Sequence, residues 1–241
     1  MVDISEHFCI IGHRGAAGER LENTLEGFEY AMNLGVDAIE LDIREHSSVL
    51  WVFHDRNLDR LGNSTGSFEK HPDPGKIRLH NGARIPKLKQ VLDLAWGKVP
   101  VNIEIKAVKN LDLLLELLSR YPQPPDETPN GLPWILVSSF DHRSLMQLHQ
   151  RACPWPLAPI ISHIPTWEEI EPVNGIIVPW SWHFDDEHLD FFQIAKLREH
   201  GIASLVYTVN DPERMDELRK RGVAGVFTDV PSVMLAHRDA T

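Results

Sequence analysis

The chain has 241 residues, a length compatible with two small domains or with one large α/β domain. Its composition, 42% hydrophobic and 24% charged residues, is typical of a globular protein and excludes a largely disordered chain. The formal net charge is -11, from 24 Lys and Arg against 35 Asp and Glu. Because a nonspecific duplex-binding surface needs Lys and Arg against the phosphates, nucleic acid is not an expected partner. A small phosphate ligand would need locally placed positive charge or a cation held by carboxylates.

The sequence contains no segment expected to insert stably into a membrane, since no stretch approaches the roughly 18 consecutive apolar residues of a spanning helix. Before Arg14 there is no Lys or Arg, and the apolar run over residues 8–11 is too short for a signal peptide. Cys9 and Cys153 are the only cysteines, and neither belongs to a CxxC pair. We therefore expect a cytoplasmic protein. The sequence leaves the oligomeric state open, a homo-oligomer included.

Short β-branched segments alternate with segments of helical periodicity, a pattern typical of βαβ units around a parallel sheet. The predicted strands cover residues 8–11, 37–43, 101–105, 134–138, 157–161, 175–178, 203–207 and 225–227. The predicted helices cover residues 24–34, 88–95, 111–120, 143–151, 166–170, 187–200, 212–221 and 231–237. Eight strands with eight following helices predict a single domain, residues 1–241, folded as a (β/α)₈ TIM barrel, whose usual size is about 250 residues.

One long segment interrupts this alternation after the second predicted strand. Residues 49–86 contain an extra strand-like run over residues 49–53, and then a loop rich in Gly and Pro. Connections of this length are usually either functional or disordered. We therefore predict an insertion in the barrel over residues 49–86.

Polar side chains share one face of the second and third predicted strands. The alternation of side chains places Glu40 with Asp42, and Asn102 with Glu104 and Lys106, opposite apolar residues. In a barrel these faces point inward, and active sites lie at the carboxyl ends of the strands. Carboxylates buried together need a cation or protons to neutralise them. Glu40, Asp42 and Glu104 therefore predict a site for a hard divalent ion, Mg²⁺ or Ca²⁺, with a solvated or salt-bridged cluster as the alternative.

Two histidines and two cations accompany this cluster in the sequence. His13 and Arg14 follow the first predicted strand between Gly12 and Gly15, which combines a proton-transfer group with a charge suited to phosphate. His54 follows the strand-like run and is suited to proton transfer near pH 7. Lys106 shares a face with Glu104 and would bring positive charge to a phosphate oxygen. A lone histidine is more often structural, so His13 and His54 are distinguished only by their neighbours.

Seven short motifs, in order from about residue 10 to residue 231, resemble those of the glycerophosphodiester phosphodiesterase family. They are His13-Arg14-Gly15, Glu22-Asn23-Thr24, Glu40-Leu41-Asp42, His54-Asp55, Glu104-Ile105-Lys106, Tyr207-Thr208-Val209-Asn210 and Phe227-Thr228-Asp229. The resemblance implies a TIM barrel with an insertion after the second strand. It also implies a divalent metal on Glu40, Asp42 and Glu104, general acid and base roles for His13 and His54, and phosphate binding by Arg14 and Lys106.

The resemblance also implies substrate contacts for residues outside these roles. Glu22 would line the same pocket, and Tyr207 stands where the family usually has a Trp that packs against the glycerol side of the substrate. Phe140 ends the fourth predicted strand, where substrate contact and core packing are both compatible with its position. Leu21 replaces the family's usual Pro, which should alter loop rigidity more than chemistry.

The resulting hypothesis is a metal-dependent phosphoric diester hydrolase that converts a small phosphodiester, such as glycerophosphocholine or glycerophosphoethanolamine, into sn-glycerol 3-phosphate and an alcohol. We assign His54 as base and His13 as acid. One alternative is a lysophospholipase D-like or sphingomyelinase D-like enzyme acting on a larger lipid. The other is a noncatalytic phosphate-ligand binding protein on the same barrel.

Overall fold

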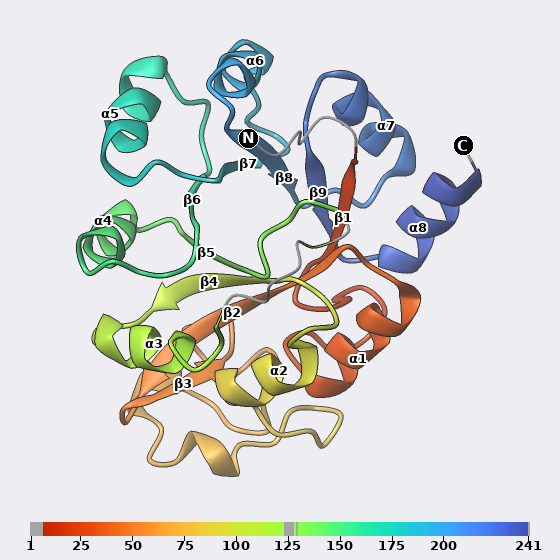
Figure 1. The fold of residues 1–241 in the computed structure, drawn as a ribbon. Helices are drawn as coiled ribbons and strands as arrows, with labels where there is room; N and C mark the ends of the chain where they lie inside the picture. Colours follow the sequence, from red (N-terminus) through yellow and green to blue (C-terminus); the bar gives the residue numbers. More distant parts are fainter. Residues whose placement is uncertain (1–6, 123–127, 129, 241) are drawn as a thin grey trace.

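The computed structural model describes residues 7–122, 128 and 130–240. Within these residues, eight parallel strands form a closed ring with helices around it (Figure 1). The ring closes because β1 pairs with both β2 and β9. The fold is a TIM barrel, as the sequence predicts. Its strands are β1 (Cys9–Gly12), β2 (Ala38–His46), β4 (Val101–Ala107), β5 (Ile135–Ser139), β6 (Leu157–Ile161), β7 (Ser181–Asp185), β8 (Ala203–Tyr207) and β9 (Gly225–Thr228).

The helices cover the outside of the ring and bury the apolar face of each strand. Ile39, Leu41 and Ile43 of β2 are fully buried in this layer. Capping side chains begin several helices, as where Thr24 accepts a hydrogen bond from the Gly27 N–H at the start of α1. The helices are α1 (Leu25–Leu34), α2 (Leu88–Ala95), α3 (Leu111–Leu118), α4 (His142–Gln150), α5 (Trp167–Ile177), α6 (Phe191–Glu199), α7 (Pro212–Lys220) and α8 (Pro231–Ala240).

The strand predicted over residues 175–178 is wrong, because most of that segment is the last turn of α5. The β-branched run suggests a strand, but Ile170, Val173 and Ile177 recur at helical spacing and are buried together. The capping box between Thr166 and Glu169 starts this helix. The barrel strand is instead β7, where the outward Trp182 and Phe184 alternate with polar residues. The expected helix over residues 187–200 is correspondingly shorter, since α6 begins at Phe191.

The segment between β2 and α2 leaves the barrel wall and packs partly on itself. It starts with β3 (Val49–Val52), which runs antiparallel to β2, and contains the short 3₁₀ helices η1 (Phe68–Lys70) and η2 (Pro74–Lys76). It lies at the bottom of Figure 1, below α2 and β3. Its apolar side chains form a small core of their own: Trp51, Phe53, Leu58, Leu61, Phe68, Ile77, Leu79 and Ile85.

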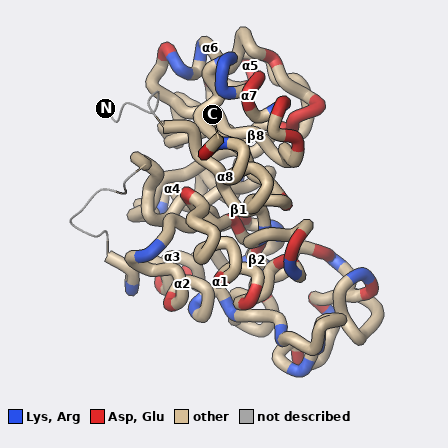
Figure 2. The backbone as a smooth tube through the Cα atoms, turned by 90° about the vertical axis from the view of Figure 1, so that its right-hand side faces the viewer, with Lys and Arg blue, Asp and Glu red and all other residues tan. Residues whose placement is uncertain are grey.

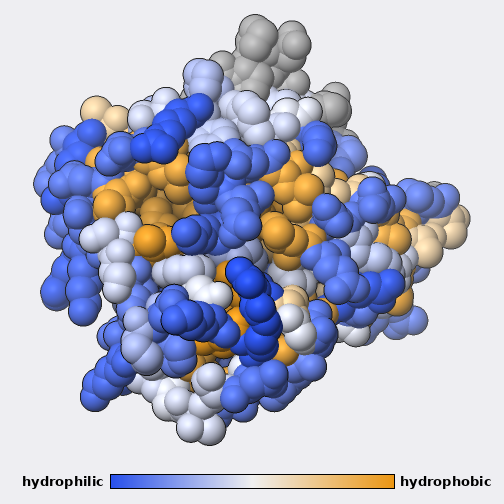
Figure 3. All heavy atoms as spheres, turned by 90° about the horizontal axis from the view of Figure 1, so that it is seen from below, coloured by the Kyte–Doolittle hydropathy of each residue, from blue (hydrophilic) through white to orange (hydrophobic). Residues whose placement is uncertain are grey.

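The surface mixes charges of both signs. On the side that Figure 2 turns to the viewer, acidic and basic positions are scattered among uncharged ones along the described chain. The face seen from below in Figure 3 carries mainly hydrophilic side chains, with hydrophobic atoms exposed in separate patches. Among the described residues, no helix has both the length and the apolar character needed to span a bilayer.

Candidate active site

Three carboxylates meet at the carboxyl ends of β2 and β4. The parallel register places Asp42 opposite Glu104 and Glu40 opposite Asn102. Glu40, Asp42 and Glu104 are all buried, and each offers an oxygen within 4.8 Å of the others. The alternation of side chains along two adjacent strands is enough to bring these groups together.

Two cations partly neutralise the carboxylates. Lys106 Nζ lies 2.5 Å from Glu104 Oε1 and 3.4 Å from Asp42 Oδ1. Arg14 donates its backbone N–H to Glu40 Oε2 at 2.8 Å, and its Nε lies 3.2 Å from Asp42 Oδ2. Burial alone would raise the pKa of Asp42, but Lys106 and Arg14 lower it below its usual value. Asp42 is therefore the most firmly ionised member of the cluster.

The cations Arg14 and Lys106 neutralise the other two carboxyl groups, Glu40 and Glu104, less completely than Asp42. Burial, followed by the charges of Asp42 and Glu104, raises the pKa of Glu40 well above its usual value. Burial and the Asp42 charge raise the pKa of Glu104 to about 7. Glu40 Oε1 and Asn102 Oδ1 are buried without a hydrogen-bond partner among the described residues. Oxygen ligands, unpaired acceptors and excess negative charge fit a hard divalent cation such as Mg²⁺ or Ca²⁺.

His13 is held beside this cluster from the end of β1. Its Nδ1 lies 2.6 Å from Asp229 Oδ1, and its Nε2 lies 3.9 Å from Glu40 Oε2. Asn210 donates to Asp229 Oδ2 at 3.1 Å and accepts the Asp229 backbone N–H at 2.8 Å. The carboxylate is thus fixed on both sides, so Nδ1 keeps its proton and Nε2 faces the cluster.

His54 is held in the same way from the end of β3. Its Nδ1 lies 2.7 Å from Asp55 Oδ1. Hydrogen bonds from Arg60 and His54 outweigh burial and lower the pKa of Asp55 to about 2. Burial lowers the pKa of His54 itself below its usual value, which favours the neutral imidazole. Each of the two predicted proton-transfer residues therefore has a carboxylate on Nδ1, and both line the same cavity.

Glu22 joins the barrel side of the site to the segment after β3. It accepts a hydrogen bond from Arg14 at 2.8 Å, and both of its oxygens are bound by Arg60 at 2.6 and 2.7 Å. Arg60 also donates to both oxygens of Asp55, at 2.7 and 3.0 Å. The resemblance places Glu22 on the pocket wall, whereas the structure places it behind Arg14, outside the lining of the cavity. It is positioned to orient Arg14.

A cavity of about 310 Å³ opens over these groups. It is lined by His13, Arg14, Glu40, His54, Glu104 and Lys106, while Asp42 lies beneath them. Phe140 and Tyr207 form one wall, with their ring centroids 6.0 Å apart. Phe140 is 44% exposed, so it belongs to the mouth of the cavity and not to the core. The remaining lining residues are Asn102, Ile160, His183, Asp185, Thr208 and Phe227.

Comparison with known proteins matches this chain to one family. The family model described as the glycerophosphoryl diester phosphodiesterase family matches residues 13–233. The chain belongs to this family. It is accordingly a phosphoric diester hydrolase, as the sequence motifs predict.

Some relatives align with nearly the whole chain and others with about half of it. A glycerophosphodiester phosphodiesterase from Caldanaerobacter subterraneus is 29% identical over 252 residues, covering 94% of this chain and 96% of the relative. A human lysophospholipase D is 36% identical over 137 residues, covering 49% of this chain and 42% of that protein. A structure of an Oleispira antarctica phosphodiesterase, solved with its product sn-glycerol 3-phosphate, has the same fold, with a TM-score of 0.84 at 24% identity and 96% coverage of each chain.

Several residues of the site in this phosphodiesterase are not assigned a role by the sequence. Asp229 belongs to a recognised motif, but its partner His13 is 216 positions away. Arg60 reaches Glu22 across 38 positions. The sequence does not assign His183 to the barrel interior, because the predicted strand over residues 175–178 lies before the true strand β7. It lines the cavity as a buried side chain and shares a hydrogen bond with Ser181 at 3.0 Å, and burial lowers its pKa to about 3. His183 is therefore neutral at pH 7.

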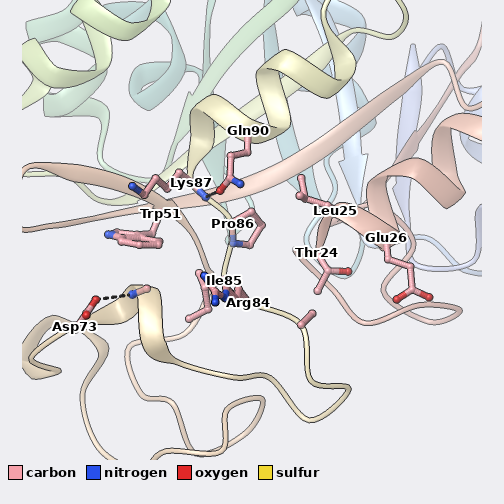
Figure 4. Close-up of a pocket in the computed structure, with 12 residues that line it drawn as sticks. Thr24, Leu25, Glu26, Trp51, Asp73, Arg84, Ile85, Pro86, Lys87 and Gln90 are labelled. Carbon is pink, nitrogen blue, oxygen red and sulfur yellow. Dashed lines mark hydrogen bonds between the residues drawn. The ribbon is translucent and has the colours of Figure 1, made fainter.

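A separate cavity of about 740 Å³ lies between α1, α2 and the segment after β3. Figure 4 shows Trp51, Pro86 and Lys87 above it, with Glu26 and Asp73 on opposite sides. The Asp73 carboxylate accepts the Gly75 N–H, which caps η2. Among the described residues, the only group of acids that could share a metal ion is Glu40, Asp42 and Glu104, so we assign the enzyme's chemistry to the smaller cavity.

Proposed function

We propose that the enzyme hydrolyses glycerophosphodiesters to sn-glycerol 3-phosphate and an alcohol, using two histidines as general acid and base and a bound divalent metal. The observation that carries this proposal is the convergence of His13 and His54, each with a carboxylate on Nδ1, on one cavity that also holds three acids and two cations. Geometry of this kind is suited to proton transfer on both sides of a phosphoryl group.

In this proposal the charged residues of the cavity position the diester. Arg14 and Lys106 bind the nonbridging phosphoryl oxygens and stabilise the charge that develops on them. Glu40, Asp42 and Glu104 would hold Mg²⁺ or Ca²⁺, which supplies Lewis-acid stabilisation of the same oxygens. Phe140 and Tyr207 pack against the organic part of the substrate. Tyr207 is fixed for this role because its hydroxyl donates to the Ile161 carbonyl at 2.8 Å.

The histidines carry the proton transfers. His54, whose pKa is lowered by burial, removes the proton of the nucleophile through Nε2. His13 donates its Nε2 proton to the departing alkoxide, while Asp229 stabilises the imidazolium before transfer. The nucleophile is water, or the neighbouring glycerol hydroxyl, which would give a cyclic phosphate that is then hydrolysed. Trapping a cyclic phosphate with a slowed variant would support the second route.

The test is release of sn-glycerol 3-phosphate, coupled to its oxidation, from glycerophosphocholine, glycerophosphoethanolamine and related diesters with and without Mg²⁺ or Ca²⁺. We expect turnover that requires the metal and stops with chelator. Binding of diester without product would favour a noncatalytic phosphate-binding protein. Activity unchanged by chelator would refute the metal part of the proposal.

The match to a human lysophospholipase D supports a second candidate, action on a monoacyl lipid diester. Phe140 at the exposed mouth of the cavity could contact an acyl chain. Parallel assays with detergent-dispersed lysophosphatidylcholine and soluble glycerophosphocholine separate the two substrate classes. The free thiols of Cys9 and Cys153 support a reducing, cytoplasmic compartment in either case.

A further inference from the structure

Asn102 is a buried amide in the lining of the cavity of about 310 Å³, the reaction cavity. It lies on β4, is 4% exposed, and takes no part in the proposed proton transfers or phosphate contacts. The parallel register places it opposite Glu40, and the alternation along β4 puts it on the same face as Glu104. Because paired strands are about 4.8 Å apart, the amide stands beside the carboxylate cluster.

The hydrogen bonding of Asn102 leaves its oxygen without a partner. Nδ2 donates to Ser138 Oγ at 3.1 Å, and Ser138 is fully buried on β5. Since β4 lies between β5 and β2, this bond engages the side of the amide that faces away from Glu40. Asn102 Oδ1 and Glu40 Oε1 are both buried, and neither has a hydrogen-bond partner among the described residues. Neighbouring buried acceptors without a donor are costly unless a cation satisfies them.

The carboxylates alone can offer a metal only a few oxygens. Glu40 Oε2 accepts the Arg14 backbone N–H, and Asp42 Oδ2 accepts the Asn23 amide at 2.8 Å, so each of these acids has one oxygen left. Even with both oxygens of Glu104, the cluster would supply at most four ligands. Ca²⁺ takes about six to eight oxygen ligands and Mg²⁺ takes an octahedral set, and the carbonyl oxygen of an Asn side chain is a ligand of this class.

We propose that Asn102 Oδ1 is a further ligand of the divalent metal in the reaction cavity and that Ser138 is a positioning residue that orients its amide. This inference rests on the proposed function, because it concerns the metal that the proposed function requires. A neutral amide adds an oxygen without adding to the repulsion among the three carboxylates. The ion in turn satisfies the unpaired oxygens of Glu40 and Asn102.

Calorimetric titration of the metal-free enzyme with Mg²⁺ or Ca²⁺ tests the assignment independently of turnover. Asn102→Leu keeps the approximate size of the side chain and removes its oxygen, so the Kd of the ion should rise about tenfold, which corresponds to about 1.4 kcal/mol. Asn102→Asp restores an oxygen ligand and should bind the ion at least as tightly as the wild type. Ser138→Ala frees the amide and should raise the Kd by a smaller factor, because partners that orient a ligand contribute to metal affinity.

Gln193→Met is the matched control. Gln193 is also a buried amide, 7% exposed, whose oxygen has no hydrogen-bond partner in the described part of the chain. It lies on the outer helix α6 and does not line the reaction cavity, so this variant should bind the ion with the wild-type Kd. The free energy of unfolding without ion, measured for each variant, shows that the variants fold.

Two results would overturn the inference. One is a Kd for Asn102→Leu that is no weaker than that of the Gln193→Met control. The other is weaker ion binding by Asn102→Asp than by the wild type, a criterion that holds even where Asn102→Leu does not fold. A wild-type enzyme that binds neither Mg²⁺ nor Ca²⁺ would instead refute the metal part of the proposed function.

Discussion

Replacing Asp229 by Asn changes one hydrogen bond of His13 while keeping the size of the side chain. Asn210 donates to Asp229 Oδ2, so the new amide must turn its oxygen toward Asn210 and its NH₂ group toward His13 Nδ1. His13 can then only accept at Nδ1, which removes the proton there and the carboxylate that stabilises the imidazolium. Loss of a hydrogen bond to a charged group costs about 1.5 to 3 kcal/mol, and a wrong tautomer costs more. We expect kcat to fall by about 10² to 10³.

The assay is steady-state release of glycerol 3-phosphate at saturating metal, with kcat and KM determined separately. KM should change by less than about threefold, because Asp229 does not line the cavity. Asp216→Asn is a matched control, since Asp216 holds His237 at 2.9 Å on the outer helices α7 and α8. A kcat for Asp229→Asn as close to wild type as that of the control would refute the assigned role of His13.

Three further changes probe the site. Arg60→Gln frees Glu22 and Asp55 together, so kcat should fall about tenfold, and added guanidinium should restore part of it because Arg60 is half exposed; no loss would contradict a positioning role. Glu104→Gln removes one proposed ligand, so half-maximal activity should need at least about tenfold more Mg²⁺ or Ca²⁺, and an unchanged metal titration would exclude that ligand. His183 has a pKa of about 3 in the folded protein, against an ordinary value of 6.5. Below pH 6.5 the unfolded chain therefore binds a proton that the folded protein does not, and the free energy of unfolding decreases as the pH is lowered. Denaturant unfolding at pH 7.5 and 5 should therefore show about 2 kcal/mol less acid destabilisation in His183→Gln than in the wild type, and equal losses would disprove the burial effect.

The barrel could be predicted from the sequence because local patterns determine it. Strands such as β6 and β8 have the predicted bounds, and the alternation in β2 and β4 directs Glu40, Asp42 and Glu104 to one point. The failure at β7 has a local cause as well. A β-branched run at the end of α5 resembles a strand, and only the spacing of its buried residues shows that it is helical.

The contacts that orient the site could not be predicted, because they join distant parts of the chain. Asp229 meets His13 only when the ring closes between β1 and β9. Arg60 meets Glu22 only when the segment after β3 folds back over the barrel. Sequence patterns identify the reacting side chains, whereas tertiary packing determines which residues hold them.

The most direct test of the account is turnover by His13→Ala and His54→Ala with the diester and metal that the wild type uses best. General acid and base catalysis contributes about 10²- to 10⁴-fold, so each variant should lose kcat within that range while still binding the divalent ion. Retained ion binding, measured by calorimetry, shows that the carboxylate cluster is intact. Near wild-type kcat in both variants would contradict the assignment of the two histidines and, with it, the proposed mechanism.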